Sequence, residues 1–291
     1  TLAGDDGACP YFWPIGDRHI LLFFSHMSGG QYLLGDYDSE RDKFMATAHG
    51  KFNFGASTPS GVHAPSATPD GEDVITIFNM NPGKPTGEWN QIMTLPRRLT
   101  LVGEEDLQME PAGDIESLRT NHRRLEEMNL PANEEVVLEG IEGKAMEIQA
   151  ELDHRGVPAL EMNVLRSPDG EERTRIAFFH KRGMAHSGRF DPPGRHYSLV
   201  SIDSSRSSIL PDVRPRGPEM AEVLVGDEEP LRLRVFVDRS VVEVYVNGRQ
   251  CLAVRVYPGR QDSAGVSLRA QGREAHLKSL DAWQMKTIYD V

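Results

Sequence analysis

The chain has 291 residues, which is enough for two domains and for a hydrophobic core that needs no covalent cross-links. It carries 32 lysine and arginine residues against 44 aspartate and glutamate residues, and its formal net charge is −12. This balance argues against a nucleic-acid partner bound through a general basic surface, and a neutral or weakly polar substrate is easier to reconcile with it.

Residues 1 to about 111 have the pattern of short strands separated by turns, with no convincing amphipathic helix. Apolar runs between glycine- and proline-rich turns predict strands at residues 19–25, 31–37, 73–79 and 91–100. Short strands at this spacing are typical of a sandwich, a barrel or a propeller.

The pattern changes at Asp114. In the run DIESLRTNHRRLEEM the apolar residues recur near helical spacing, and an acidic residue follows soon after Asp114, a plausible cap. We therefore expect one linker helix of about three or four turns within residues 114–130, ended by Pro131.

Strand patterning returns after the expected helix and continues to the end of the chain. It predicts about nine short strands, at residues 136–138, 145–152, 159–165, 175–180, 196–202, 231–246, 251–257, 265–268 and 277–285. Their number and their alternation of apolar and polar residues favour a β-sandwich of two antiparallel sheets.

The segment at residues 231–257, LRLRVFVDRSVVEVYVNGRQCLAVRVY, is the clearest strand signal. Valines alternate with polar residues, and Asn247-Gly248 supplies two residues that tolerate a positive φ, so we expect an antiparallel hairpin there. The segment FVDRSVVEVYVNG resembles a sequence in the C-terminal β-sandwich of glycoside hydrolase family 32. This family comprises the β-fructosidases, which include invertases, inulinases and levanases.

The first part of the chain also resembles that family, in which a five-bladed propeller precedes the sandwich. The segments KFNFGASTPSGVHAPSATPDGEDVITIFNM and EWNQIMTLPRRLTL are similar to family segments from the fourth blade onward. The resemblance implies an all-β chain with three parts: a partial propeller, blades three to five, at residues 1–113; a short linker helix at residues 114–130; and a β-sandwich at residues 131–291.

The family's catalytic carboxylates have no counterpart in the matching motifs. Its third blade opens with Glu-Cys-Pro, whose Glu is the general acid/base, but this chain has Ala8-Cys9-Pro10. The family's Asn-Asp-Pro-Asn motif, which supplies the nucleophile, does not occur. Since glycoside hydrolysis needs two carboxyl groups, activity is left open. Asp5 and Asp6 could reach the pocket in place of the missing acid, or they could simply form a turn.

Four residues are candidate sugar-binding residues by their match to the family's segments: Asn53, His63, Trp89 and Asn90. His63 could donate a hydrogen bond to a sugar hydroxyl or be held by backbone groups in a turn. Trp89 could stack on a sugar or fill the core between blades. No metal site and no cofactor are expected.

Several other residues have structural interpretations. Cys9 and Cys251 lack metal-ligand spacing and are read as buried small side chains. Arg97 and Arg98 are expected at the junction of propeller and sandwich, with an anion clamp as the alternative. Glu243, together with its neighbours in the hairpin, is expected to make cross-strand ion pairs.

Three functions fit the resemblance. The chain is the C-terminal part of an enzyme that acts on β-fructofuranosides such as sucrose or fructans, a non-catalytic relative that binds fructan or another glycan, or a unit that mediates oligomerisation through its sandwich. Because two or three blades cannot close a propeller, a companion chain, a second copy or a longer parent chain should cover the open edge.

The sequence leaves the compartment open. No run of about 18 apolar residues predicts a membrane helix. The N-terminal residues lack the pattern of a signal peptide, although a peptide already removed would leave the same sequence, so a cytoplasmic or a secreted protein fits.

Overall fold

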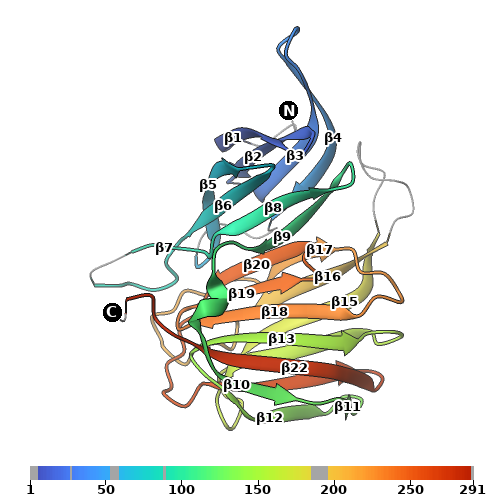
Figure 1. The fold of residues 1–291 in the computed structure, drawn as a ribbon. Coiled ribbons are helices and arrows are strands. Elements are labelled where there is room, and N and C mark those ends of the chain that lie inside the picture. The colour runs from blue at the N-terminus through green and yellow to red at the C-terminus, as the bar shows by residue number, and fades with distance from the viewer. Residues whose placement is uncertain (1–5, 27, 53–58, 88–89, 185–195, 290–291) are drawn as a thin grey trace.

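The computed structural model describes residues 6–26, 28–52, 59–87, 90–184 and 196–289. Within these ranges the chain is built of strands, and its one helical segment is the 3-10 helix η1 (Ile115–Leu118). Figure 1 shows a smaller upper unit, which holds the N-terminal strands, above a larger unit made of two layers of strands. No helix in the described ranges is long and apolar enough to cross a membrane.

The upper unit consists of two antiparallel sheets in which the main strands follow one another in chain order. The first sheet contains β1 (Ala8–Ile15), β2 (Arg18–Ser25), β3 (Gly29–Asp38) and β4 (Lys43–Lys51). The second contains β5 (Val62–Asp70), β6 (Asp73–Met80), β8 (Arg97–Val102) and β9 (Asp106–Pro111), with the short β7 (Ile92–Met93) beside β6.

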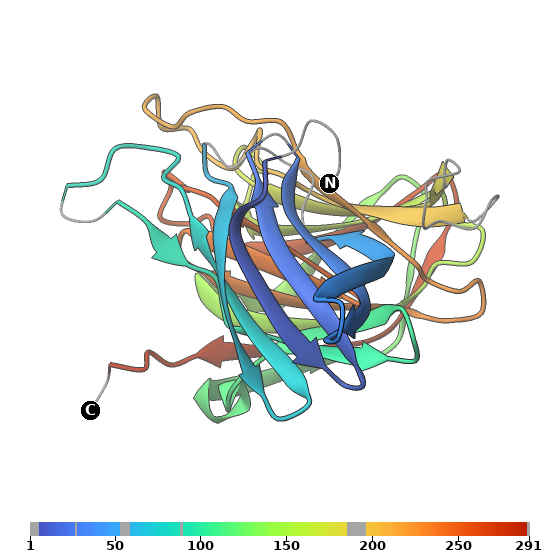
Figure 2. The same cartoon turned by 90° about the horizontal axis from the view of Figure 1, so that it is seen from above.

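The two upper sheets pack face to face, with their first strands β1 and β5 in contact. The core between them includes Ile20 and Leu22 of β2, Leu34 of β3, and Val74 and Phe78 of β6, all fully buried. Figure 2 shows the two sheets beside each other above the sandwich. Two consecutive meanders packed in this way are what the propeller prediction requires of neighbouring blades, and closure into a propeller stays a prediction.

The lower unit is a β-sandwich, as predicted. One layer has the order β10 (Arg119–Leu125), β22 (Ala275–Met285), β13 (Ala145–Asp153), β18 (Leu231–Asp238), β19 (Val241–Val246) and β20 (Gln250–Arg255), with β11 (Met128–Leu130) also paired to β22. The other has the order β12 (Glu135–Glu142), β21 (Gly265–Gln271), β14 (Ala159–Arg166), β15 (Thr174–Met184), β16 (His196–Asp203) and β17 (Glu219–Val223).

Alternation along the strands decides which side chains enter the sandwich core. In β19, Val242, Val244 and Val246 point into the core between the layers. Glu243 and Tyr245 therefore face the opposite side of the sheet, toward the upper unit. Their burial there shows that both faces of β19 are covered, which is why this strand is buried at every position.

The linker helix predicted within residues 114–130 is wrong. Only η1 is helical, and the chain then runs as β10 and β11, both paired with β22. The apolar spacing that suggests a helix is divided between two structures, since Ile115 packs beside Phe236 and Tyr245 while Leu125 packs on the sandwich core. Pairing with a strand some 160 residues away outweighs the weak local preference.

Two strand predictions are also corrected. Residues 91–100 form two strands, β7 and β8, because Pro96 has no N–H to donate to a sheet ladder. Residues 231–246 form a tight hairpin of β18 and β19 that turns at Arg239-Ser240, where Arg239 has φ +51°. The turn predicted at Asn247-Gly248 is present, with φ values of +50° and +64°, so three strands form a meander.

The two cysteines differ in environment. Cys251 is fully buried, as expected, but Cys9 is exposed and has φ +49°, so the prediction for Cys9 is wrong. The register of β1 and β2 shifts between Ala8 and Tyr11, and Cys9 lies in this irregularity.

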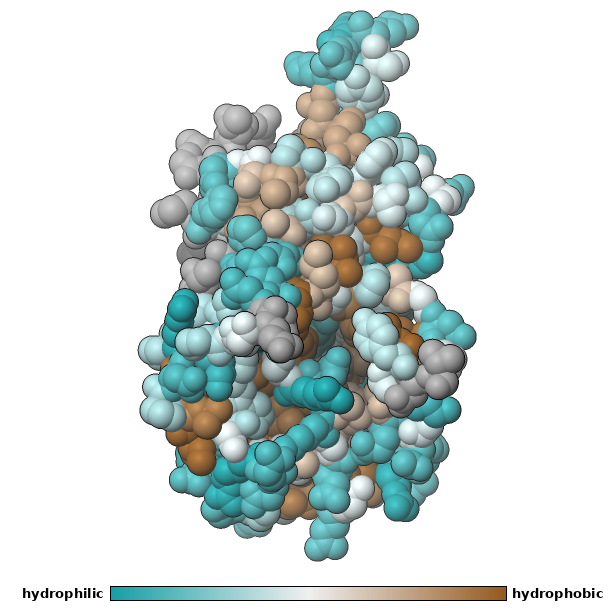
Figure 3. Space-filling model, turned by 90° about the vertical axis from the view of Figure 1, so that its left-hand side faces the viewer, coloured by the Kyte–Doolittle hydropathy of each residue, from teal (hydrophilic) through white to brown (hydrophobic). Residues whose placement is uncertain are grey.

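A buried ion pair joins the two units. Arg97 of β8 contacts Glu243 of β19 at 3.3 Å, and their side chains are 1% and 2% exposed. The other Glu243 oxygen accepts the Leu95 N–H at 2.6 Å. The prediction that Arg97 serves the junction is confirmed, whereas the cross-strand ion pair predicted for Glu243 is wrong. Figure 3 shows one side of the molecule, where hydrophilic and apolar side chains are mixed and the surface is hollowed near its middle.

Candidate functional site

Three strand ends meet at one end of the upper unit. Ala8 opens β1 and pairs with Phe24 near the end of β2. The Phe24 ring contacts the ring of His63 at the start of β5, with centroids 4.9 Å apart. We call Asp6, Ala8, Phe24, His26 and His63 the strand-end cluster.

Asp6 and His26 form a pair within this cluster. The His26 backbone N–H donates to Asp6 Oδ1 at 2.9 Å, and His26 Nδ1 contacts Asp6 Oδ2. Both side chains are about half exposed. The hydrogen bond to His26 holds the pKa of the Asp6 carboxyl below its usual value, so Asp6 is a carboxylate at neutral pH. The Asp6 carboxylate fixes the orientation of the His26 ring through Nδ1, the other ring nitrogen being Nε2.

His63 lies beside this pair. Its ring centroid is 5.6 Å from that of His26. Burial lowers the pKa of His63, and the nearby His26 lowers it further, because both disfavour a positive charge on the His63 ring. His63 is therefore a neutral imidazole at neutral pH, with one nitrogen that donates and one that accepts a hydrogen bond.

Amide side chains continue the polar surface along neighbouring strands. In the first sheet, the buried Gln31 accepts a hydrogen bond from His49 Nε2 at 2.7 Å if that nitrogen carries the proton. In the second sheet, Asn79 pairs with His63 across the strands and bonds to Gln91, whose amide donates to Asn81 at 3.2 Å. Gln31 and Asn81 are buried, so the half-buried Asn79 and the exposed Gln91 are the amides that can bind the hydroxyls of a neutral polar ligand.

The structure tests the placement of only some candidate residues. Asp5, Asn53 and Trp89 lie outside the described residues. Asn90 is exposed, and its backbone oxygen accepts a hydrogen bond from Arg255 Nη1 at 3.1 Å. The pairing of Asp6 with His26 is a feature that the sequence interpretation missed. Its signal is the β1 to β2 hairpin register, which carries residue 6 back to residue 26.

The cluster can bind and orient a ligand and can exchange protons. An imidazole held by a carboxylate is a general acid or base near neutral pH. Glycoside hydrolysis by retention needs two carboxyl groups about 5–5.5 Å apart. Ala8, which by sequence resemblance matches the acid/base position of family 32, has only a methyl group, and Asp6, the carboxylate among the described cluster residues, is already bound to His26.

Comparison with known proteins identifies the lineage. Residues 114–284, more than half of the chain, match the family model described as "Glycosyl hydrolases family 32 C terminal". The chain belongs to glycosyl hydrolase family 32. The family model covers η1 and nearly all of the sandwich, including β10 and β11.

Individual family 32 proteins are similar over a longer stretch. A fructan 1-exohydrolase of Bromus pictus is 24% identical, covering 91% of this chain and 48% of its own length. A levanase of Bacillus subtilis is 22% identical, covering 90% of this chain and 38% of its own length. The crystal structure of fructan 1-exohydrolase IIa from Cichorium intybus superposes with a TM-score of 0.81 at 18% identity, covering 97% of this chain and 62% of that one.

The comparisons cover most of this chain but only part of the related proteins. The structural likeness shows that the described upper unit and sandwich share the fold of the corresponding part of a family 32 protein. The chain spans about half, or less, of the length of the two curated relatives. Partial coverage of this kind does not establish the activity or the ligand of the whole protein.

Proposed function

We propose that this chain acts on β-fructofuranosides, such as sucrose or fructans, and that the strand-end cluster contributes to the sugar site. Membership of family 32 carries this proposal. The cluster supports it, because neutral His63 and the amides of Asn79 and Gln91 offer hydrogen-bond groups to sugar hydroxyls. Asn53, Trp89 and Asn90 are proposed to complete the sugar site.

A second candidate function is sugar binding without hydrolysis. Ala8 favours it, since a methyl group cannot protonate the departing oxygen. The Asp6 carboxylate supports it too, because its low pKa makes it a poor proton donor at neutral pH. Under this proposal the chain alone retains a ligand that the catalytic members of the family would cleave.

The experiment is isothermal titration of the chain with sucrose, inulin and levan oligosaccharides, paired with an assay for released reducing sugar. Binding followed by release of reducing sugar would support the first function, and binding without hydrolysis would support the second. His63→Ala should weaken binding at least about tenfold, a loss near 1.4 kcal/mol, because it removes a half-buried hydrogen-bonding group from the site.

The matched control is His276→Ala, which removes an imidazole of similar exposure from β22 of the sandwich. It should bind as the unchanged chain does. Robust turnover would contradict the argument from Ala8. Equal binding by the His63 and His276 variants would remove the strand-end cluster from the proposal, and absence of any binding would favour the third function, oligomerisation.

We also propose that a companion chain or a second copy covers the open face of the first upper sheet. Phe12 and Tyr37 on this face are exposed by 37% and 36%. The Phe12 ring also contacts the rings of His19 and Phe44, so the aromatic side chains form a cluster on this sheet. Exposed apolar clusters commonly mark an interface. Light scattering should show a species larger than 32.5 kDa, and a compact monomer would contradict the proposal.

A further inference from the structure

A cavity of about 490 Å³ lies between the two units, away from the strand-end cluster. Its wall is the end of β9 and the turn at Asn247-Gly248, and its floor is the outer face of β13, β18 and β22. Figure 1 shows these three strands facing the viewer below β9. The volume is within the range of roughly 300–1,000 Å³ that is typical of small-molecule sites. We call this cavity the junction groove.

Four of the five charged side chains that line the junction groove are in ion pairs, namely Glu151, Arg232, Arg234 and Asp281, and the fifth, Glu110, accepts a hydrogen bond from Gln108. Arg232 Nε lies 3.1 Å from Glu151 Oε2. Asp281 lies 3.1 Å from Arg124 Nη1 and 2.7 Å from His122 Nε2. A strongly charged ligand would have to displace one of these partners, so the groove favours a neutral one.

The same lining is rich in groups that donate and accept hydrogen bonds. Gln108 donates to Glu110 at 2.8 Å, and Gln149 donates to buried Glu147 at 2.8 Å, so both amides have fixed orientations. Carboxylates accept and arginines donate beside them. A molecule with many hydroxyl groups, each able to donate and to accept, matches this lining better than an apolar ligand does.

The wall of the groove is held in place before any ligand arrives. The Asn247 amide nitrogen donates to Glu229 Oε1 at 3.0 Å and to the Pro230 carbonyl at 2.9 Å. The Gly248 carbonyl accepts the Met109 N–H of β9 at 2.6 Å. These bonds fix the turn against β9, which reduces the entropy lost when a ligand binds.

We propose that the junction groove binds a short neutral oligosaccharide at a site separate from the strand-end cluster. The class of ligand follows from the paired charges, the oriented amides and the volume of the groove. The proposal does not rest on the proposed function, since any neutral oligosaccharide of suitable shape would satisfy this chemistry.

The test is calorimetric titration of the full chain with inulin-type and maltose-type oligosaccharides. Ser279→Trp fills the groove from the solvent-facing side of β22, and Ser205→Trp adds the same indole to an exposed turn remote from it. We expect groove binding to weaken at least about tenfold in the first variant and to be unchanged in the second. It should also survive His63→Ala, which separates this site from the strand-end cluster.

Gln149→Ala provides a second variant that removes one lining amide without adding bulk. It should weaken the same binding event, and circular dichroism checks that both variants fold. Equal binding by the Ser279 and Ser205 variants, no binding of either sugar series at millimolar concentration, or groove binding of inorganic phosphate in preference to the sugars would each overturn the proposal.

Discussion

Replacing Glu243 by leucine should destabilise the protein by about 3–5 kcal/mol, because it leaves the buried Arg97 guanidinium without its counter-charge and the Leu95 N–H without its acceptor. Burial raises the pKa of the Glu243 carboxyl above its usual value, while Arg97 acts in the opposite direction. Urea denaturation of Glu243→Leu and of the unchanged chain, followed by circular dichroism, measures the loss.

Two further variants make this prediction specific. The double variant Arg97→Met with Glu243→Leu removes both charges, so it should recover part of the loss that Glu243→Leu causes. The control is Arg98→Met, which removes the adjacent guanidinium that pairs with Asp70 and Asp73 at the surface, and it should cost less than about 1 kcal/mol. A double variant as unstable as the sum of the single variants would contradict a coupled pair.

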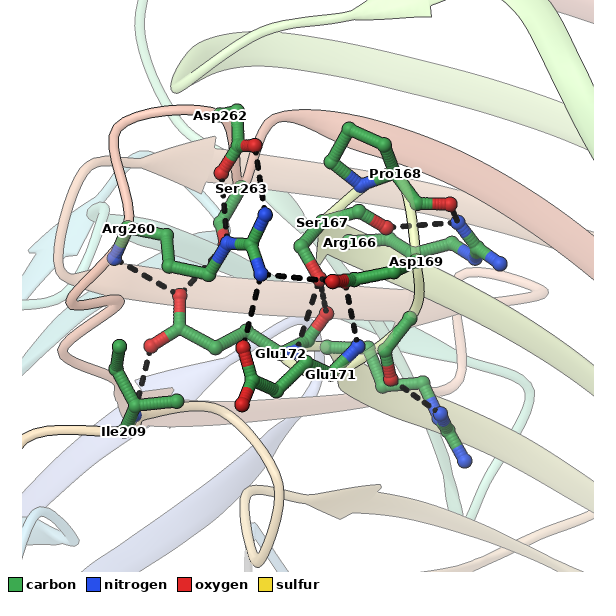
Figure 4. A network of polar contacts seen from close by, with 12 residues as sticks. Arg166, Ser167, Pro168, Asp169, Glu171, Glu172, Ile209, Arg260, Asp262 and Ser263 are labelled. Atoms are coloured by element: carbon green, nitrogen blue, oxygen red, sulfur yellow. Dashed lines mark hydrogen bonds and ion pairs between the residues drawn. The ribbon is translucent and has the colours of Figure 1, made fainter.

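Replacing Glu172 by alanine should cost at least about 3 kcal/mol, because the buried carboxylate holds three loops together. It accepts the N–H groups of Ile209 at 2.7 Å, Gly259 at 2.8 Å and Arg260 at 3.1 Å, and the Ser263 hydroxyl at 2.6 Å. Figure 4 shows the Ile209, Arg260 and Ser263 donors converging on it. Thermal and urea unfolding measure the effect.

The matched control is Glu171→Ala. Glu171 is exposed and pairs with Arg260 at the surface, so its loss should cost less than about 1 kcal/mol. Burial tends to raise the pKa of Glu172, but its four donors hold it below the usual value. The unfolded chain then binds the proton more tightly, so this stabilisation is present above the unfolded pKa and is lost as pH falls through the folded one. Equal losses for both variants would refute the role.

Much of the sandwich could be predicted from the sequence because the signals are local. Valine alternation in β18 and β19, and Asn247-Gly248 at the next turn, depend on neighbouring residues alone. The turn at Arg239-Ser240 is missed because neither residue is glycine or asparagine, although Arg239 adopts a positive φ. The linker is wrongly predicted as a helix because the apolar residues of η1 and β10 together have nearly helical spacing. Pairing with the distant strand β22 is what makes this segment a strand.

The candidate site could be predicted only in part. Ala8 is recognised from a motif, and His63 from a matched segment, since each is a property of its own position. The Asp6 and His26 pair depends on hairpin register, and the Arg97 and Glu243 pair depends on how two units dock. Glu243 belongs to a strand whose outer face would ordinarily be solvated, so a pattern within the strand cannot reveal its partner.

The pairing of β10 and β11 with β22 determines where the chain can be cut. A fragment that begins at residue 131 would lack both strands and would leave the backbone of β22 without partners along one side. Such a fragment should be prone to aggregate through that edge. The segment expected to be a linker therefore pairs with β22 as part of the sandwich sheet, and a fragment meant to keep that sheet intact must include β10 and β11.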